Sequence, residues 1–340
     1  MQVRSTSPHG KAGFPCSLNR IAPLPHSHPL ISDLGEHALI ERIRARVPAA
    51  PAWVTIGIGD DAAVLEPARG ELDVVTTDCQ VEDVHFKRAW MSMHDIGRKA
   101  LAVNLSDLAA MGAAPRAATL SLALPRTLLV ADFDALIDGF LSLAHEARVP
   151  LVGGNLAESP GPIVIDVTLI GSIRRRKIMR RDAGRAGHLL YVTGTLGRAA
   201  AAVARALRGE ADGALAPLSS VSRLTCGQQV ARNRLASACM DISDGLADAV
   251  RQMSAQSGTG ARILSSKIPV DAGATLEQAL SGGEDYELLF AVPARRRRAF
   301  ETVAARHARV TCIGQLTPGP AVELDLDGRI EPLGGGFTHF

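Results

Sequence analysis

Four short clusters of aspartate stand at turns beside apolar segments, and they are the residues of this chain best suited to chemistry. The clusters are Gly57-Ile58-Gly59-Asp60-Asp61, Thr76-Thr77-Asp78, Asn104-Leu105-Ser106-Asp107 and Asp241-Ile242-Ser243-Asp244-Gly245. A carboxylate in such a place gains nothing from packing and loses hydration unless it is paired. Carboxylate and hydroxyl oxygens are hard ligands suited to Mg²⁺, which bridges a few carboxylates to substrate phosphates. If the clusters converge in the fold, they form a polyanionic site that needs divalent cations.

Each cluster taken alone also has an ordinary structural explanation. Gly-Asp and Asp-Gly pairs are common in turns, Asp244 could cap a helix, and Thr77-Asp78 could cap a loop. The sequence contains no G-x-x-x-x-G-K-[ST] loop and no G-x-G-x-x-G word after a strand. A nucleotide bound by this chain would therefore be held without the usual phosphate-binding loops.

The elements that would position these clusters form two α/β sets divided near residue 172. The first set is expected to contain helices over 34–47, 92–111 and 131–147, with strands near 54–58, 72–77, 117–124, 151–152 and 163–173. Gly112 is expected to end the second of these helices. The second set is expected to contain helices over 197–208, 218–235 and 244–256, with strands near 189–193, 239–240, 287–292, 309–313 and 321–324. Gly227 is a poor interior residue for its helix.

The expected domains are a disordered extension over 1–33, an N-terminal α/β domain over 34–172 and a C-terminal α/β domain over 173–340. Residues 1–30 lack the apolar core of a signal peptide. The five cysteines form no C-x-x-C pair, which favours reduced thiols and a cytoplasmic location. No apolar run of about 18 residues is present, so a membrane span is not expected.

The charge balance gives no reason to expect nucleic acid or an anionic membrane as a partner. Thirty-seven basic and 35 acidic residues leave a formal net charge of +2. The arginine runs at 174–177 and 295–298 could be basic patches, but solvated strand ends and helix faces are their expected places.

Several longer words surround the aspartate clusters and keep a defined order. They are Gly57-Ile-Gly-Asp-Asp-Ala-Ala-Val-Leu65, Thr76-Thr-Asp78, Val84-His-Phe86, Lys99-Ala-Leu-Ala-Val-Asn-Leu-Ser-Asp-Leu-Ala-Ala-Met-Gly112, Gly153-Gly154, Tyr191-Val-Thr-Gly-Thr-Leu-Gly197, Asp241-Ile-Ser-Asp-Gly-Leu246 and Ser281-Gly-Gly-Glu-Asp-Tyr-Glu-Leu-Leu-Phe290. From about Leu34 to the C-terminus, these words resemble the thiamine-monophosphate kinases. That family belongs to the superfamily of aminoimidazole ribonucleotide synthetase and selenophosphate synthetase.

The resemblance implies a two-domain α/β fold like that of aminoimidazole ribonucleotide synthetase. It also implies a homodimer in which the N-terminal sheets pair, with ATP and several Mg²⁺ ions in the cleft between the domains. Matching metal positions are Asp61, Thr76, Thr77, Asp78, Asp107, Asp241 and Asp244, and Asn155 stands where the family has a metal-binding aspartate. Matching ATP positions are Gly154, Asn155, Arg181 and Ser243, and matching thiamine-phosphate positions are His85, Glu284 and Phe337. No catalytic residue separate from the metal ligands is implied.

The chemistry of the residues agrees with these roles. The phosphate of such an acceptor is already anionic at neutral pH, so the obstacle to transfer is its repulsion from the triphosphate, which Mg²⁺ ions would neutralise. A cationic thiazolium ring would favour a carboxylate such as Glu284 and an aromatic face such as Phe337. Structural explanations remain open, because Glu284 could be a turn residue, Phe337 could pack the C-terminus and His85 could be a satisfied structural histidine.

Three departures from the family pattern leave the acceptor and the number of metal ions open. The usual Gly-Gly-Asp-Thr word is Gly153-Gly-Asn-Leu156, the usual Thr-Arg-Gly-Pro is Ala157-Glu-Ser-Pro160, and the usual Glu-Gly is Glu82-Asp83. The expected function is ATP-dependent phosphorylation of thiamine phosphate to thiamine diphosphate. The alternatives are a divergent paralogue with another small acceptor and a catalytically degenerate nucleotide-binding protein.

Overall fold

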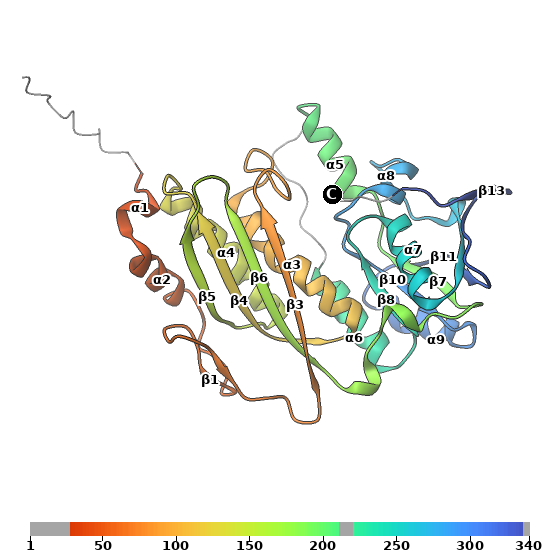
Figure 1. The fold of residues 1–340 in the computed structure, drawn as a ribbon, viewed down its shortest axis with the longest axis horizontal. Coiled ribbons are helices and arrows are strands. Elements are labelled where there is room, and N and C mark those ends of the chain that lie inside the picture. Colours follow the sequence, from red (N-terminus) through yellow and green to blue (C-terminus); the bar gives the residue numbers. More distant parts are fainter. Residues whose placement is uncertain (1–27, 211–219, 336–340) are drawn as a thin grey trace, which may run out of the picture.

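The computed structural model describes residues 28–210 and 220–335, which form two mixed α/β domains side by side (Figure 1). This arrangement confirms the predicted two-domain α/β fold class. Phe337, predicted to contact the acceptor, lies outside the described residues.

The N-terminal domain is a four-stranded sheet with two long helices on one face. Its elements are α1 (Ile31–Leu34), α2 (Glu36–Arg44), β1 (Val54–Ile56), β2 (Val64–Leu65), β3 (Leu72–Val81), α3 (Met93–Met111), β4 (Ala114–Leu124), α4 (Val130–Ala147), β5 (Leu151–Glu158) and β6 (Val164–Ile173). The sheet order is β3-β6-β4-β5, and β1 pairs separately with β2. Along β6 the residues Ile165, Val167 and Leu169 are fully buried, whereas Asp166 and Thr168 are only half-buried. Alternation therefore turns the apolar face toward the helices and leaves the other face polar.

The C-terminal domain is a seven-stranded sheet with helices on both faces. Its elements are the short 3₁₀ turns η1 (Arg175–Lys177), η2 (Arg181–Ala183), η3 (Ser265–Lys267) and η4 (Ala294–Arg296), the strands β7 (Leu189–Thr193), β8 (Ala238–Ile242), β9 (Gly260–Leu264), β10 (Glu287–Val292), β11 (Val310–Thr317), β12 (Val322–Leu326) and β13 (Arg329–Pro332), and the helices α5 (Arg198–Leu207), α6 (Ser220–Arg232), α7 (Leu246–Ser257), α8 (Leu276–Ser281) and α9 (Arg297–Ala304). The sheet order is β13-β12-β9-β11-β7-β10-β8. Its neighbouring strands pair antiparallel, except that β9 and β12 pair in parallel. Strand β8 is an edge of this sheet and contacts α3 of the N-terminal domain.

Helix α3 connects the two domains, since it contacts β3 and β6 of its own domain and α6 and β8 of the other domain. Its N-terminus is capped by Ser92, whose Oγ accepts from the Asp95 amide at 3.1 Å, and it ends at Gly112 with a left-handed φ of 74°. One continuous apolar core runs from the first sheet past α3 to Leu224 of α6 and Phe290 of β10. The two domains therefore share a hydrophobic core.

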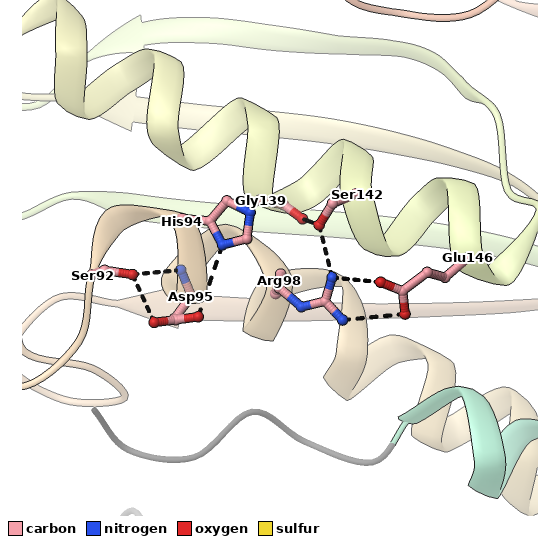
Figure 2. Close-up of polar contacts among 7 residues, drawn as sticks. All are labelled: Ser92, His94, Asp95, Arg98, Gly139, Ser142 and Glu146. Atoms are coloured by element: carbon pink, nitrogen blue, oxygen red, sulfur yellow. Dashed lines mark hydrogen bonds and ion pairs between the residues drawn. The ribbon is translucent and has the colours of Figure 1, made fainter.

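Glycines allow α3 to approach its neighbouring helices at backbone distance. A Cβ at Gly139 of α4 would lie 1.9 Å from the His94 carbonyl oxygen of α3, and a Cβ at Gly97 would lie 2.0 Å from the Leu136 carbonyl oxygen. Figure 2 shows this crossing, where Arg98 of α3 donates to Glu146 of α4 at 2.8 and 3.2 Å. Gly227 of α6 has the same role, because a Cβ there would lie 2.0 Å from the Ala109 carbonyl oxygen. The residue that weakens the helix pattern is the one that the packing requires.

Some elements have other bounds than the sequence predicted, and some short elements were not predicted at all. The strand expected at 151–152 continues to Glu158, and the helix expected from 244 begins at Leu246. Strands β9 and β13 and helices α8 and α9 were not expected, because each is short. The arginine run at 295–298 forms η4 and the start of α9, as a solvated helix face would. In the part of the chain that the structure describes, no helix is long and apolar enough to cross a membrane.

We expect Gly139→Ala to lower the free energy of unfolding by about 1–3 kcal/mol, because the new methyl group must push α3 and α4 apart. The higher helix propensity of alanine, worth about 1 kcal/mol, opposes this loss without cancelling it. Gly161→Ala is the matched control, since nothing lies within 4 Å of a Cβ at Gly161. Urea denaturation of the three proteins measures the difference, and equal stability of Gly139→Ala and wild type would contradict the close helix packing.

Candidate functional site

Residues of β3 and α3 meet at the centre of the candidate site. Thr76 and Asp78 are two residues apart in β3, so their side chains point to the same side of the sheet, toward α3. The Thr76 hydroxyl donates to Asp107 Oδ2 of α3, and the Asp78 and Asp107 carboxyl groups share a hydrogen bond. The structure thus brings together three of the predicted metal positions from one domain.

Asp241 joins this group from the other domain. It lies near the end of β8, is 5% exposed, and accepts a hydrogen bond from Ser106 Oγ at 2.9 Å. Ser106 and Asp107 are adjacent in α3, so a single turn of one helix presents a hydroxyl to one buried carboxylate and a carboxylate to another. We name Thr76, Asp78, Asp107 and Asp241 the acidic cluster.

The acidic cluster holds more negative charge than its surroundings compensate. The pKa of Asp78 is raised to about 7, first by burial and then by the charges of Asp107 and Asp241. The pKa of Asp241 is raised to about 6, again first by burial and then by the charge of Asp107. Burial also raises the pKa of Asp107, although the hydrogen bond from Thr76 lowers it. A raised carboxyl pKa means that the ionised form is disfavoured. A bound cation would favour the ionised form and lower these pKa values.

Arg181 supplies positive charge to this cluster. Its positive charge lowers the pKa values of both Asp107 and Asp241. The guanidinium is held by α7, because Nη1 donates to Gln252 Oε1 at 3.0 Å and Gln252 in turn donates to Asp248 at 2.5 Å. A predicted ATP contact therefore lies beside the predicted metal ligands.

The turn between β8 and α7 carries Ser243 and Asp244. Ser243 Oγ donates to Asp244 Oδ2 at 2.9 Å, and Gly245, with φ of 98°, is the residue that precedes α7. Asp244 is therefore not the N-cap of this helix. Asp241 lies in β8 and Asp244 in the turn directly after it, so both aspartates are near the end of this edge strand.

A second group of predicted residues forms beside the acidic cluster. His85 follows the end of β3, and its Nδ1 accepts a hydrogen bond from the Val81 amide at 3.0 Å. Glu284 lies on the loop before β10 and accepts a hydrogen bond from Lys99 Nζ of α3 at 2.6 Å. Lys99 also donates to the His85 carbonyl oxygen at 2.5 Å. The two predicted acceptor contacts that the structure describes thus meet at one lysine.

Four predicted positions are not joined to the acidic cluster. Thr77 points to the opposite face of the sheet from Thr76, where its hydroxyl donates to Asp166 and to the Val167 carbonyl oxygen at 3.2 Å. Gly154 and Asn155 are exposed on β5, at the other edge of this sheet. Asp61 is exposed in the loop between β1 and β2, where its amide donates to Asp60 at 2.9 Å. The roles predicted for these residues stay predictions.

The donor set fits Mg²⁺ in kind, although the cluster is not a ready-made metal cage. Across residues 28–210 and 220–335, no three His, Cys, Asp or Glu side chains are grouped so that they hold a metal ion by themselves. Mg²⁺ differs from zinc in this respect, because it keeps several waters and needs only one or two carboxylates in addition to substrate phosphates. Oxygen donors with raised pKa values and a shortage of positive charge are suited to such a shared site.

Sequence reasoning missed three residues of the site. Lys99 and Ser106 lie within the long word 99–112, but their partners Glu284 and Asp241 lie in the other domain, so no local pattern indicated them. Tyr286 is half-buried with φ of 49°, and its pKa is raised first by burial and then by the negative charges of Glu284 and Asp78. No pattern in the sequence indicated that a tyrosine would lie beside so many carboxylates.

Both halves of the chain match models of one protein family. Residues 59–173 match the AIR synthase related protein N-terminal domain, and residues 185–327 match its C-terminal domain. The thiamine-monophosphate kinase of Synechococcus elongatus is 36% identical over 91% of this chain and 98% of its own length. That of Salmonella typhimurium is 36% identical over 83% of this chain and 90% of its own length.

Solved structures agree with these relatives. The thiamine-monophosphate kinase from Stenotrophomonas maltophilia is 36% identical, with a TM-score of 0.75 over 87% of this chain and 98% of that chain. The structure of AaThiL complexed with AMPPCP and TMP is 30% identical, with a TM-score of 0.68 over 93% of this chain and 100% of that chain. The Escherichia coli hydrogenase maturation protein HypE, at 20% identity and a TM-score of 0.76, shares the fold alone. The resemblance in the sequence words is therefore confirmed, and the chain belongs to the thiamine-monophosphate kinase family within the AIR synthase related proteins.

Proposed function

We propose that this protein phosphorylates thiamine phosphate with ATP, giving thiamine diphosphate, and that Mg²⁺ ions assist the transfer at the acidic cluster. The observation that carries the proposal is the meeting of Thr76, Asp78, Asp107 and Asp241, from two domains, around a surplus of negative charge. The complex of AaThiL with AMPPCP and TMP supports the pairing of a nucleotide with a phosphorylated acceptor in this family.

The residues of the chain divide the work between the two substrates. Thr76, Asp78, Asp107, Asp241 and Asp244 would hold Mg²⁺, which supplies charge neutralisation between two anionic phosphates. Arg181, already fixed by Gln252, would bind the nucleotide phosphates from the side of α7. Glu284 and His85 would hold the acceptor on the side of α3 that carries Lys99. No general base is required, because the attacking phosphate oxygen is ionised at neutral pH.

A divergent paralogue that phosphorylates another small acceptor is the second candidate. Asn155 and the altered segment 157–160 favour it, because both depart from the family pattern. Structurally, Asn155 lies on the strand β5, at the opposite edge of the sheet from β3. Retention of four converging cluster residues argues against a degenerate nucleotide-binding protein, because buried carboxylates are costly to keep without a cation.

We expect the purified protein to form thiamine diphosphate from ATP and thiamine phosphate in the presence of Mg²⁺. Thiamine should react at least about a hundredfold more slowly, because its alcohol needs a general base that the site does not provide. Chromatographic detection of both products gives the two rates. Comparable rates would refute the proposed reaction, and turnover only with another phosphate ester would establish the second candidate.

Asp107→Asn should reduce kcat on the order of a hundredfold or more, because the amide removes the charge at the centre of the cluster. The variant should fold, since the neutral amide relieves repulsion and its oxygen can still accept the Thr76 hydrogen bond. In thermal unfolding, Mg²⁺ with ATP should stabilise the wild type much more than the variant.

Asp138→Asn is the control for that variant. Asp138 is an exposed aspartate of α4 whose carboxylate pairs with Arg46 at 3.0 Å, outside the site. Wild-type turnover of Asp107→Asn at saturating Mg²⁺ would show that the acidic cluster does not hold the metal.

We also propose that the protein is a homodimer in which the N-terminal sheets pair. Strand β3 supports this, because it is an edge of its sheet and carries Val75, which is 65% exposed. Light scattering should give twice the mass of one chain, and Val75→Lys should shift the protein toward the monomer. Ile330→Lys, on edge strand β13 of the other sheet, should leave the mass unchanged. A wild-type monomer, or equal effects of both substitutions, would contradict pairing through β3.

A further inference from the structure

Lys99 is a buried cation that connects two segments of the candidate site. It lies in α3, is 8% exposed, and is separated from Glu284 by 185 positions of sequence. Its Nζ reaches the Glu284 carboxylate at 2.6 Å and the His85 carbonyl oxygen at 2.5 Å. An ammonium group has three donors, and two of them are used here to fix residues from different domains.

Glu284 is held in an unusual position by contacts at both its backbone and its side chain. Its φ is 69°, a left-handed conformation that costs energy in a residue other than glycine. Its amide donates to the Ser243 carbonyl oxygen at 2.6 Å, which ties it to the turn after β8. The Glu284 side chain is 32% exposed and the Lys99 side chain 8% exposed. The carboxylate is therefore open to a ligand, with the ammonium group beneath it.

The segment that carries His85 is fixed in a similar way. The His85 amide donates to the Val81 carbonyl oxygen at 2.9 Å, and Asp83 in the same turn has φ of 66°. The hydrogen bond from Lys99 to the His85 carbonyl oxygen adds a contact from α3 to this turn. The turn thus depends on both the end of β3 and the helix.

We propose that Lys99 is a positioning residue for the phosphate acceptor, which sets the orientation of the Glu284 carboxylate and of the turn that carries His85. This inference rests on the proposed function, because the acceptor roles of Glu284 and His85 are part of it. Fixing both groups before the acceptor binds removes an ordering cost from binding. Charge alone predicts the opposite effect, since a neighbouring ammonium group weakens the attraction of a carboxylate for a cationic ring.

Lys99→Met is the informative variant. Methionine keeps the length and the helix propensity of lysine, and it leaves a partly exposed carboxylate instead of a buried unpaired charge. Glu284→Gln would leave the Lys99 ammonium group buried without its partner, so its effects would be harder to interpret. Arg98→Met is the matched control, because Arg98 precedes Lys99 in α3 and pairs with Glu146 on α4, away from the site (Figure 2).

Steady-state kinetics tests the role in acceptor binding. Lys99→Met should raise KM for thiamine phosphate about tenfold, in line with the loss of a charge-assisted hydrogen bond, while KM for ATP stays unchanged. Arg98→Met should change neither constant. A lower KM for thiamine phosphate, or equal rises in both KM values, would overturn the proposal, because neither results from lost acceptor positioning.

Hydrogen–deuterium exchange tests the positioning without any substrate. Lys99→Met should exchange faster than wild type over residues 82–86 and 282–286, and Arg98→Met should not. Unchanged exchange in these segments refutes the role of Lys99 whatever the kinetics show. Lack of thiamine-phosphate turnover by the wild type refutes the proposed function, and it removes acceptor binding from the role of Lys99. The two failures are therefore distinguished.

Discussion

The burial of like charges where α3 meets β3 and β8 is the constraint on which the rest of the site depends. Burial raises the pKa values of Asp78, Asp107 and Asp241, and the charge of Asp107 raises those of Asp78 and Asp241 further. Two hydroxyl donors, Thr76 and Ser106, offset part of this cost. Such an arrangement persists only where the surrounding structure imposes it, and here the packed backbone of α3 does so.

The loop before β10 shows how the two domains are held around this charge. Glu284 reaches Lys99 of α3, and Asp285 accepts hydrogen bonds from the Gly197 and Ala199 amides at 2.6 and 3.3 Å, at the start of α5. Glu287 then forms a buried ion pair with Arg223 of α6. Glu284 and Asp285 of this loop, with Glu287 at the start of β10, thus contact three different helices. A sequence word that reads as an acidic turn is a junction between elements.

Much of the fold and the centre of the site followed from the sequence. Helix α3 was predicted to within one residue, because Ser92 and Gly112 are local signals for its two ends. The sequence left open whether its four aspartate clusters converge. Those at 76–78, 104–107 and 241–244 meet around Asp107, whereas the one at 57–61 does not. The face to which Thr77 points was not predicted, because it depends on the pairing of β3 with β6, which is not local in sequence. Lys99 was missed for the same reason, since its partner lies in the other domain.

The shared core also limits how this protein can admit its substrates. In many two-domain enzymes a hinge lets one domain rotate away from the other and opens the cleft. Here such a rotation would separate α3 from α6 at Gly227 and expose the apolar residues that the two domains bury together. The shared core therefore opposes a hinge motion of this kind, and α3, which carries Asp107, stays packed against both domains. The candidate site lies beside a boundary between two domains that is itself part of the hydrophobic interior.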